Sequence, residues 1–366
     1  MTHQTLTPPA PAIQPLEPRL FLSAAKPKVS FSITNILSNG AVTAPATDVT
    51  LINPWGTARA PGGPILVVSN AFDTATAYDG NGAPQIILGT NPPSPTLSIP
   101  PSPNAPDAHT APTAVVANTT GGFGSPLVNS TRLTTFIFAT EDGTLAAWGP
   151  GAGTQAKTVV DNNAAGAIYT GLAIAANNGV NFLYAADFHN ARIDVFDTNF
   201  NAAASPGNFF DRKLPKGYAP YNVQNLGGNL FVTYAKQNPA AATDAPGNGH
   251  GIIDVFHADG TLFARVATGK TLNSPYSLAI APPSFGPLAG ALLVANAGSS
   301  RISVFAAGTS KPAGQLTGPD KKPLTIPGLY SLYPSTGEAN TDPGAIYFAS
   351  GPNNHAAGLF GKITIT

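Results

Sequence analysis

The chain has 366 residues, with 18 basic residues balanced by 18 acidic ones and no cysteine. Charged residues make up 10% of it, whereas glycine and proline contribute 38 and 37 residues. So many helix-breaking residues argue against a helix-rich fold, and a hydrophobic content of 43% argues against disorder. The balanced charge offers nothing to attract a nucleic acid, and the lack of cysteine excludes disulfides.

The first 28 residues differ from the rest of the chain. They are rich in proline and lack the basic start of an ordinary signal peptide. Within them, the segment LEPRLFLSA, from Leu16 to Ala24, resembles the LEPR-XLL motif found near the N-terminus of many exported bacterial proteins. We therefore expect residues 1–28 to be a disordered or processed leader and residues 29–366 to be the folded domain. We also expect the protein to be exported, and to act at the cell surface or outside the cell.

A strand–turn–strand pattern recurs along residues 29–366. In LYAADFHNARIDVFD, which begins at Leu183, an apolar strand, a short polar turn and an alternating strand predict a β-hairpin. Related segments, one of them split by a long insert, begin at Ile65, Thr135, Leu230, Ala291 and Ala345. Each hairpin is preceded by a further short strand, and these strands begin at Pro54, Pro112, Tyr169, Pro220, Pro275 and Pro327. The unit repeats about every 55 residues.

Six such units, each completed to four strands by one more strand after the hairpin, predict an all-β, six-bladed β-propeller. A β-sandwich is the main alternative, but it requires no periodicity along the whole chain. The last unit ends at its third strand, Gly361 to Thr366, and an unpaired strand, Val29 to Leu37, precedes the first unit. Pairing these two strands would complete the sixth blade and remove a free sheet edge from the ring.

Parts of the sequence resemble known propellers. The segment at Leu183 is similar to the NHL repeat. A wider set of phrases resembles an uncharacterised family of exported bacterial six-bladed propellers: LINPWGTA at Leu51, FATEDGTLAAW at Phe138, YTGLAIA at Tyr169, LPKGYAPYNVQNLGGNLFVTYA at Leu214 and HAAGLFGKI at His355. The resemblance implies the propeller fold and export, and it implies no activity.

Polar residues recur in the turns that follow the second strand of the units. Because equivalent turns of a propeller lie on one face of the ring, their oxygen atoms could converge on a hard cation such as Ca²⁺ at the mouth of the central channel. The sugar-lactonase type of six-bladed propeller holds a divalent metal near its axis, and by analogy a Ca²⁺-dependent, lactonase-like hydrolase is one hypothesis. The alternative is that these side chains cap their own turns. The candidate metal ligands are Asn70, Glu141, Asp142, Asp187 and Asn296.

His189 is the candidate catalytic residue. Asp187 lies two residues before it and could orient the imidazole as a base. The alternative is a histidine packed beneath a neighbouring loop. No serine in a glycine-rich elbow, no cysteine nucleophile and no zinc-type histidine spacing accompanies it.

Aromatic residues recur near the first strand of five units, at Trp55, Tyr169, Tyr221, Tyr276 and Tyr330. They could form a ring around the channel that stacks on a sugar or another flat ligand, or they could pack as core between blades. The candidate ligand-binding residues are Trp55, Tyr221, Tyr276 and, from the last unit, His355.

Two main hypotheses follow. In the first, the protein is an exported bacterial propeller that binds a glycan, protein or small-molecule partner. It would act as a monomer, without a nucleic acid and without a membrane span, since no stretch of the chain approaches 18 apolar residues. In the second, it is the metal-dependent hydrolase described above. A redox or quinone-binding propeller has no cofactor motif to support it. The feature that separates the two hypotheses is whether carboxylates converge on the axis.

Overall fold

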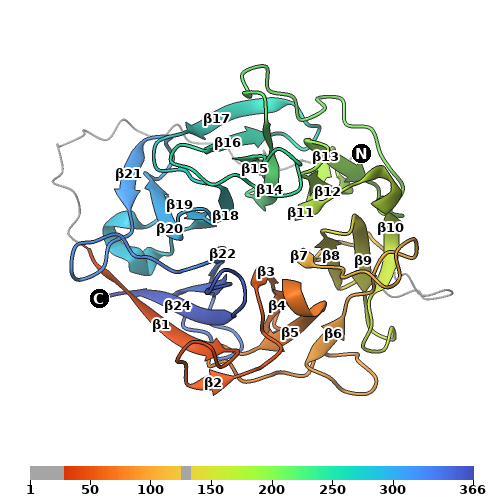
Figure 1. Cartoon of the computed structure of the whole chain (residues 1–366), viewed down its shortest axis with the longest axis horizontal. Coiled ribbons are helices and arrows are strands. Elements are labelled where there is room, and N and C mark those ends of the chain that lie inside the picture. Colours follow the sequence, from red (N-terminus) through yellow and green to blue (C-terminus); the bar gives the residue numbers. More distant parts are fainter. Residues whose placement is uncertain (1–28, 125–132) are drawn as a thin grey trace, which may run out of the picture.

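The structure, a computed structural model, describes residues 29–124 and 133–366. The expected leader with its LEPR-like segment lies outside the described residues. Six sheets are arranged around a central axis like the blades of a propeller (Figure 1). The predicted six-bladed β-propeller is therefore confirmed.

Blades one, two, four and five each contain four strands in sequential order. Blade one contains β3 (Pro54–Ala58), β4 (Ile65–Ser69), β5 (Thr74–Tyr78) and β6 (Thr96–Ser98), and blade two contains β7 (Pro112–Ala117), β8 (Phe136–Thr140), β9 (Thr144–Trp148) and β10 (Lys157–Asp161). Blade four contains β14 (Tyr218–Leu226), β15 (Asn229–Lys236), β16 (Gly251–Phe256) and β17 (Leu262–Thr268). Blade five contains β18 (Pro275–Ile280), β19 (Leu292–Asn296), β20 (Arg301–Phe305) and β21 (Pro312–Gln315). The long insert predicted in the fourth unit separates β15 from β16.

Blade three is a three-stranded sheet of β11 (Tyr169–Asn177), β12 (Val180–Asp187) and β13 (Arg192–Phe196). In place of a regular fourth strand, an isolated bridge pairs Phe196 with Ala202. The backbone N–H of Ala203 also donates to the carbonyl of Val195, at 2.8 Å. The outer edge of this blade is thus only partly paired.

The sixth blade joins the two ends of the described chain. It contains β22 (Leu329–Pro334), β23 (Ile346–Ser350), β24 (Leu359–Ile365), β1 (Phe31–Ser38) and the short β2 (Ala46–Thr47). Strand β1 pairs antiparallel with β24, from Phe31 opposite Ile365 to Ser38 opposite Leu359. The red first strand and the blue last strand accordingly lie side by side in Figure 1. Closure of the ring by the N-terminal strand is confirmed, and it pairs two edges that would otherwise be free.

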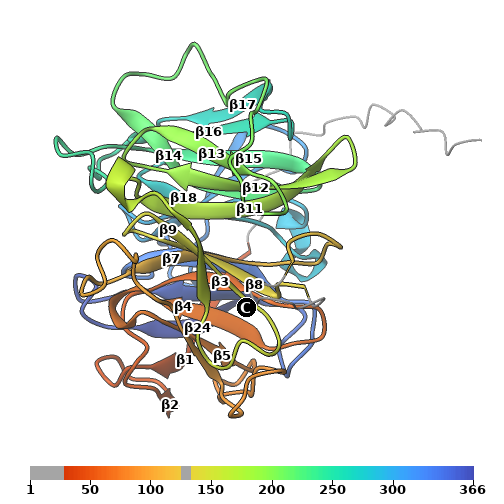
Figure 2. The ribbon, with the colours of Figure 1, turned by 90° about the vertical axis from the view of Figure 1, so that its right-hand side faces the viewer.

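The core consists of separate apolar clusters between neighbouring blades. Between blades one and two, for example, Leu66 and Val68 pack with Phe138 and Trp148. Each blade buries its faces against its neighbours, which allows a long chain to fold around many small cores. The side view shows strands crossing the thickness of the disc (Figure 2).

Helical structure in the described residues is limited to three 3₁₀ segments: η1 (Asn70–Phe72), η2 (Asn163–Ala165) and η3 (Pro283–Leu288). In this described part, no helix has the length and apolar character needed to cross a membrane.

Two glycines allow innermost strands to approach each other closely. A Cβ added to Gly171 of β11 would lie 2.5 Å from the Cα of Asn222 on β14. A Cβ added to Gly56 of β3 would lie 2.9 Å from the Cα of Ala114 on β7. Because any side chain there would collide with backbone, these positions require glycine at the present spacing of the strands.

Candidate functional site

A central pocket of about 630 Å³ is enclosed by the innermost strands of all six blades. Strands β3, β7, β11, β14, β18 and β22 each contribute to its wall. The wall extends to residues at the ends of these strands, such as Leu226, Ile280 and Pro334. The side chain of Ile280 is exposed. The pocket therefore opens on the face of the ring where the innermost strands end.

An aromatic plug, made of Trp55, Tyr221, Tyr276 and Tyr330, closes the other end of the channel. The four side chains are between 2% and 6% exposed. Trp55 stacks on Tyr330 with ring centroids 4.0 Å apart, and Tyr276 stands edge-on to both of these rings. Each member comes directly before a residue of the pocket wall, namely Gly56, Asn222, Ser277 or Ser331. The plug is therefore the floor of the pocket.

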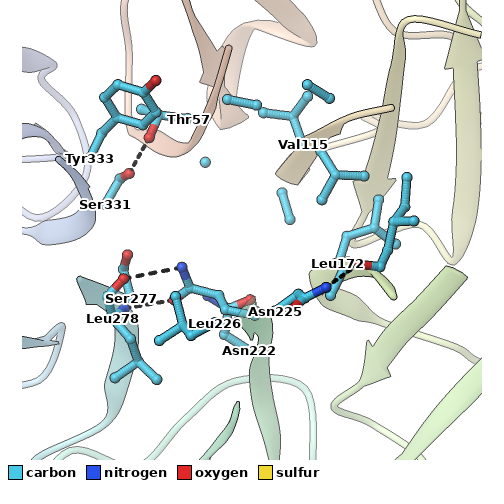
Figure 3. A pocket seen from close by; sticks show the side chains of 18 of the residues that line it. Thr57, Val115, Leu172, Asn222, Asn225, Leu226, Ser277, Leu278, Ser331 and Tyr333 are labelled. Atoms are coloured by element: carbon cyan, nitrogen blue, oxygen red, sulfur yellow. Dashed lines mark hydrogen bonds between the residues drawn. The ribbon is translucent and has the colours of Figure 1, made fainter. Parts of the chain in front are cut away.

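One side of the wall carries most of the pocket's amide and hydroxyl side chains. The amide of Asn225 donates to the carbonyl of Ile174 on the neighbouring blade, at 2.9 Å. Gln224 makes two hydrogen bonds with the backbone of Leu278, at 3.2 and 2.6 Å. The hydroxyls of Thr57 and Ser331 bond to each other between blades one and six (Figure 3). These side chains, together with Asn222 and Ser277, tie the exposed edges of the inner strands together.

The opposite side of the wall is apolar. It is formed by Ala114–Ala117 of β7 and Leu172–Ala176 of β11, and Figure 3 shows Val115 and Leu172 across the pocket from Ser277 and Ser331. Arg59 is the one charged residue among the described residues that line the pocket. The same lining contains no carboxylate, imidazole or amine. The arrangement can hold a ligand by hydrogen bonds on one side and by apolar contact on the other.

Three of the residues predicted from sequence are linked at the closed end of the channel. The Nδ1 of His355 lies 2.9 Å from the Oδ1 of Asn53, whose amide donates to Asn70 at 3.0 Å. Asn70 in turn donates to the carboxylate of Glu141 at 3.2 Å. Burial raises the pKa of Glu141, and the bond from Asn70 opposes this rise. Burial lowers the pKa of His355. This relay connects blades six, one and two.

The other three candidate metal ligands make hydrogen bonds within their own turns, and each also accepts from a backbone N–H outside it, that of Ser102, Ile168 or Asn273. Asp142 accepts from the hydroxyls of Thr140 and Thr144, at 2.5 and 2.9 Å. The amide of Asn190 donates to Asp187 at 2.8 Å, and the amide of Asn296 donates to the carbonyl of Arg301 at 3.2 Å. These bonds are those that the turn-capping alternative predicts. Across residues 29–124 and 133–366, no group of three or more histidine, aspartate or glutamate side chains could hold a metal ion.

His189 and Asp187 bond to different partners. The Nδ1 of His189 lies 3.3 Å from the carbonyl of Ala241, whereas the fully buried Asp187 accepts from Asn190. Burial raises the pKa of Asp187. The aspartate therefore does not orient the imidazole as a base in this structure.

The recurring aromatic residues serve two different purposes. Tyr169 packs in a cluster shared by blades two and three, and its hydroxyl donates to Asp194 at 2.8 Å. The other four form the plug, where they pack against one another across the axis. Of all the residues predicted as a site, Tyr276 is the one that lines the described pocket.

The polar residues of the pocket are missing from the sequence-based candidates. A signal for some of them exists, because a small or polar residue directly follows each plug aromatic, at Gly56, Asn222, Ser277 and Ser331. The signal is weak because such residues also suit the tight spacing of innermost strands. Arg59, Gln224 and Asn225 have no equivalent in the other units, so the repeat does not reveal them.

Solved structures share the fold. The soluble aldose sugar dehydrogenase of Escherichia coli, in its apo form, is 11% identical with a TM-score of 0.53, covering 92% of this chain and 99% of that one. A Bacteroides thetaiotaomicron protein of unknown function is 10% identical with a TM-score of 0.53, covering 93% and 77%. At such low identity the likeness shows the propeller fold alone. No protein-family profile matches the chain.

Two proteins of Acanthamoeba polyphaga mimivirus are similar over nearly the whole chain. Uncharacterized protein R648 is 31% identical over 361 residues, which cover 96% of this chain and 83% of that protein. Uncharacterized protein L690 is 32% identical over 362 residues, covering 96% and 89%. Because these relatives are viral, they do not show the bacterial origin that the sequence resemblance implies. The chain belongs to the family of these two mimivirus proteins.

Proposed function

We propose that the protein is a binding module whose central pocket takes a small hydroxyl-rich ligand, such as a sugar or a sugar unit of a glycan. The observation that carries the proposal is the division of the pocket wall into a side that carries most of its amide and hydroxyl groups and a side that is apolar. A sugar ring presents hydroxyls at its edge and C–H groups on its faces, which match these two sides. The volume of about 630 Å³ also falls within the usual range for small-molecule sites.

The polar side keeps hydrogen-bonding capacity for a ligand. The side-chain amides of Asn225 and Gln224 each donate one bond to a neighbouring strand. A carboxamide has two N–H donors, so each of them retains one. The hydroxyls of Thr57 and Ser331 bond to each other and keep free lone pairs.

The chemistry of the pocket supports binding over turnover. General acid–base catalysis needs a titratable group within hydrogen-bond reach of the substrate. Among the described lining residues, the phenols of Tyr276 and Tyr333 are the groups that could serve as a base after losing a proton. Burial raises the pKa of both phenols, so both keep their protons at neutral pH. Neither is suited to act as a base near neutral pH.

The test is calorimetric titration of the full chain with a panel of neutral and acidic mono- and disaccharides. Ala117→Phe adds a bulky ring at a residue that lines the pocket and borders the apolar cluster between blades one and two, so its melting temperature is compared with that of the wild type first. Ala204→Phe makes the same change at an exposed position outside the pocket. We expect a sugar to bind the wild type and Ala204→Phe alike, and Ala117→Phe at least about tenfold more weakly. Failure of every sugar to bind, or equal binding by the two variants, would contradict the proposal.

The lactonase-like alternative retains one supporting observation, the hydrogen bond between Asn70 and Glu141 near the plug. It predicts that EDTA lowers the melting temperature and that Ca²⁺ restores it, since a ligand of the folded state raises stability. Glu141→Gln should abolish this response. An EDTA response that survives in Glu141→Gln would exclude these two residues as the metal site.

We further propose that the protein acts outside the cytoplasm, at or beyond the cell surface. The support is the LEPR-like segment from Leu16 to Ala24 and the absence of cysteine. A bacterial source is part of that proposal and rests on the sequence resemblance alone. Fractionation of bacterial cells that express the full chain, or the chain without residues 1–28, tests it. Equal retention of both forms in the cytoplasm would contradict export.

A further inference from the structure

Arg59 brings a positive charge to an otherwise uncharged wall. It follows the last residue of β3 and lines the pocket near its open end. Its side chain is only 6% exposed. A guanidinium taken this far out of water requires hydrogen-bond acceptors for its donors.

The partners of Arg59 all lie on one side of its guanidinium. Its Nη2 pairs with the carboxylate of Glu338 and donates to the hydroxyl of Thr336 at 3.1 Å. Its Nη1 is buried and has no hydrogen-bond partner. A buried donor without an acceptor is costly, more so on a charged group, so this edge of the guanidinium lacks a partner that a ligand could supply.

The pair with Glu338 can be exchanged for another. The side chain of Glu338 is 48% exposed, and it comes from the segment between β22 and β23. Because Glu338 is half-exposed, its carboxylate can leave for water while a ligand carboxylate takes its place, so that the buried guanidinium stays paired.

The charge of Arg59 also reaches the polar side of the pocket. Burial raises the pKa of Tyr333, and the nearby positive charge of Arg59 opposes this rise. Tyr333 lies beside Thr57 and Ser331 in the pocket wall (Figure 3). The guanidinium therefore neighbours Tyr333, which itself lies beside the hydroxyl pair.

We propose that the ligand is an acidic sugar, whose carboxylate binds the unpartnered Nη1 of Arg59 while its hydroxyls meet the polar side of the pocket. This inference rests on the proposed function and adds the charge of the ligand to it. The planar guanidinium matches a carboxylate with parallel N–H donors, and such charge-assisted bonds are stronger than neutral ones. Glu338 pairs with Nη2 of this guanidinium and competes with the ligand.

The test compares sugars that differ only in the carboxylate. Calorimetry measures the affinity for glucuronate and galacturonate and for their neutral counterparts, glucose and galactose. We expect the wild type to bind one of the acids about tenfold more tightly than its neutral counterpart, and increasing salt to reduce this preference. Arg59→Gln should bring the ratio of the two affinities close to one.

Glu338→Gln provides a second test at a half-exposed position that should tolerate the change. By removing the competing carboxylate, it should increase the affinity for the acidic sugar several-fold and raise the ratio. Asp107→Asn is the matched control, because it removes an exposed carboxylate outside the pocket lining and should leave the ratio unchanged.

Three results would overturn the inference: equal affinity of the wild type for acidic and neutral sugars, a preference that survives in Arg59→Gln, or no gain in Glu338→Gln. If Arg59→Gln fails to fold, the result with Glu338→Gln decides. Binding of neutral sugars without a preference would leave the proposed function standing and reject only the acidic ligand. Binding of no sugar at all would reject both.

Discussion

The hydroxyl of Tyr276, on blade five, lies 2.8 Å from the backbone carbonyl of Thr170, on blade three. It also lies 3.1 Å from the carbonyl of Thr113, on blade two. One phenol thus connects the innermost strands of three blades across the axis. The plug holds the inner ends of the blades together as well as closing the channel.

Tyr276→Phe should destabilise the fold although it keeps the ring. The change leaves two buried carbonyls without this donor, and a loss of about 1–3 kcal/mol in the free energy of unfolding is expected. Urea denaturation measures it. Tyr218→Phe is the control, because Tyr218 is only partly buried and its loss of a hydroxyl should change stability little. Equal effects of the two substitutions would show that the cross-channel bonds carry no net stability.

Gly171→Ala should destabilise the protein through backbone overlap. The new Cβ would lie 2.5 Å from the Cα of Asn222, so β11 and β14 would have to separate. Overpacking of this kind costs about 1–3 kcal/mol. Gly121→Ala is the control, since a Cβ there meets nothing within 4 Å. Thermal unfolding of both variants decides, and a melting temperature as high for Gly171→Ala as for the control would refute the close approach.

Phe31→Ala tests closure of the ring by the N-terminal strand. Phe31 of β1 is fully buried and its ring lies 4.8 Å from that of Phe285. Removing such a side chain from a core costs about 3–5 kcal/mol, so a large drop in the unfolding midpoint is expected. Phe72→Ala makes the same change at a side chain that is 46% exposed and should have a small effect. A drop no larger for Phe31→Ala than for Phe72→Ala would mean that β1 is not part of the cooperative fold.

Asp254 should make stability depend on pH. Burial raises the pKa of Asp254 from 3.8 to about 6. The hydrogen bond from Arg265 opposes this rise, and the same guanidinium also pairs with Asp211. Between these two pH values the folded carboxyl keeps a proton that the unfolded one releases, so the free energy of unfolding falls as pH rises from about 4 to about 6 and then levels off. Asp254→Asn should show a smaller fall over this range. Urea titrations at several pH values measure it.

Asp107→Asn is the control for this prediction, because its carboxylate is exposed and should leave the pH dependence unchanged. If Asp254→Asn retained the full dependence of the wild type, other carboxyls would be its source.

The sequence by itself determined the architecture. The strand pattern at Leu183 and its relatives is local, and in a meander each strand pairs with the next along the chain, so a period of about 55 residues translates directly into blades. The pairing of β1 with β24 was predictable for a similar reason. In this sequence the last unit has three strands and a lone strand precedes the first unit, so pairing the two completes the sixth blade and removes free edges.

Tertiary structure decided which end of the channel is open and which residues face it. The sequence shows an aromatic residue at the start of an innermost strand, but it does not show whether that residue stacks on a ligand or on another aromatic ring. Only the assembled ring brings Trp55 against Tyr330 and turns the aromatic set into a floor. The orphaned donor of Arg59 likewise depends on burial and on Glu338, a residue far along the chain. Such properties arise from packing between blades, which strand periodicity does not encode.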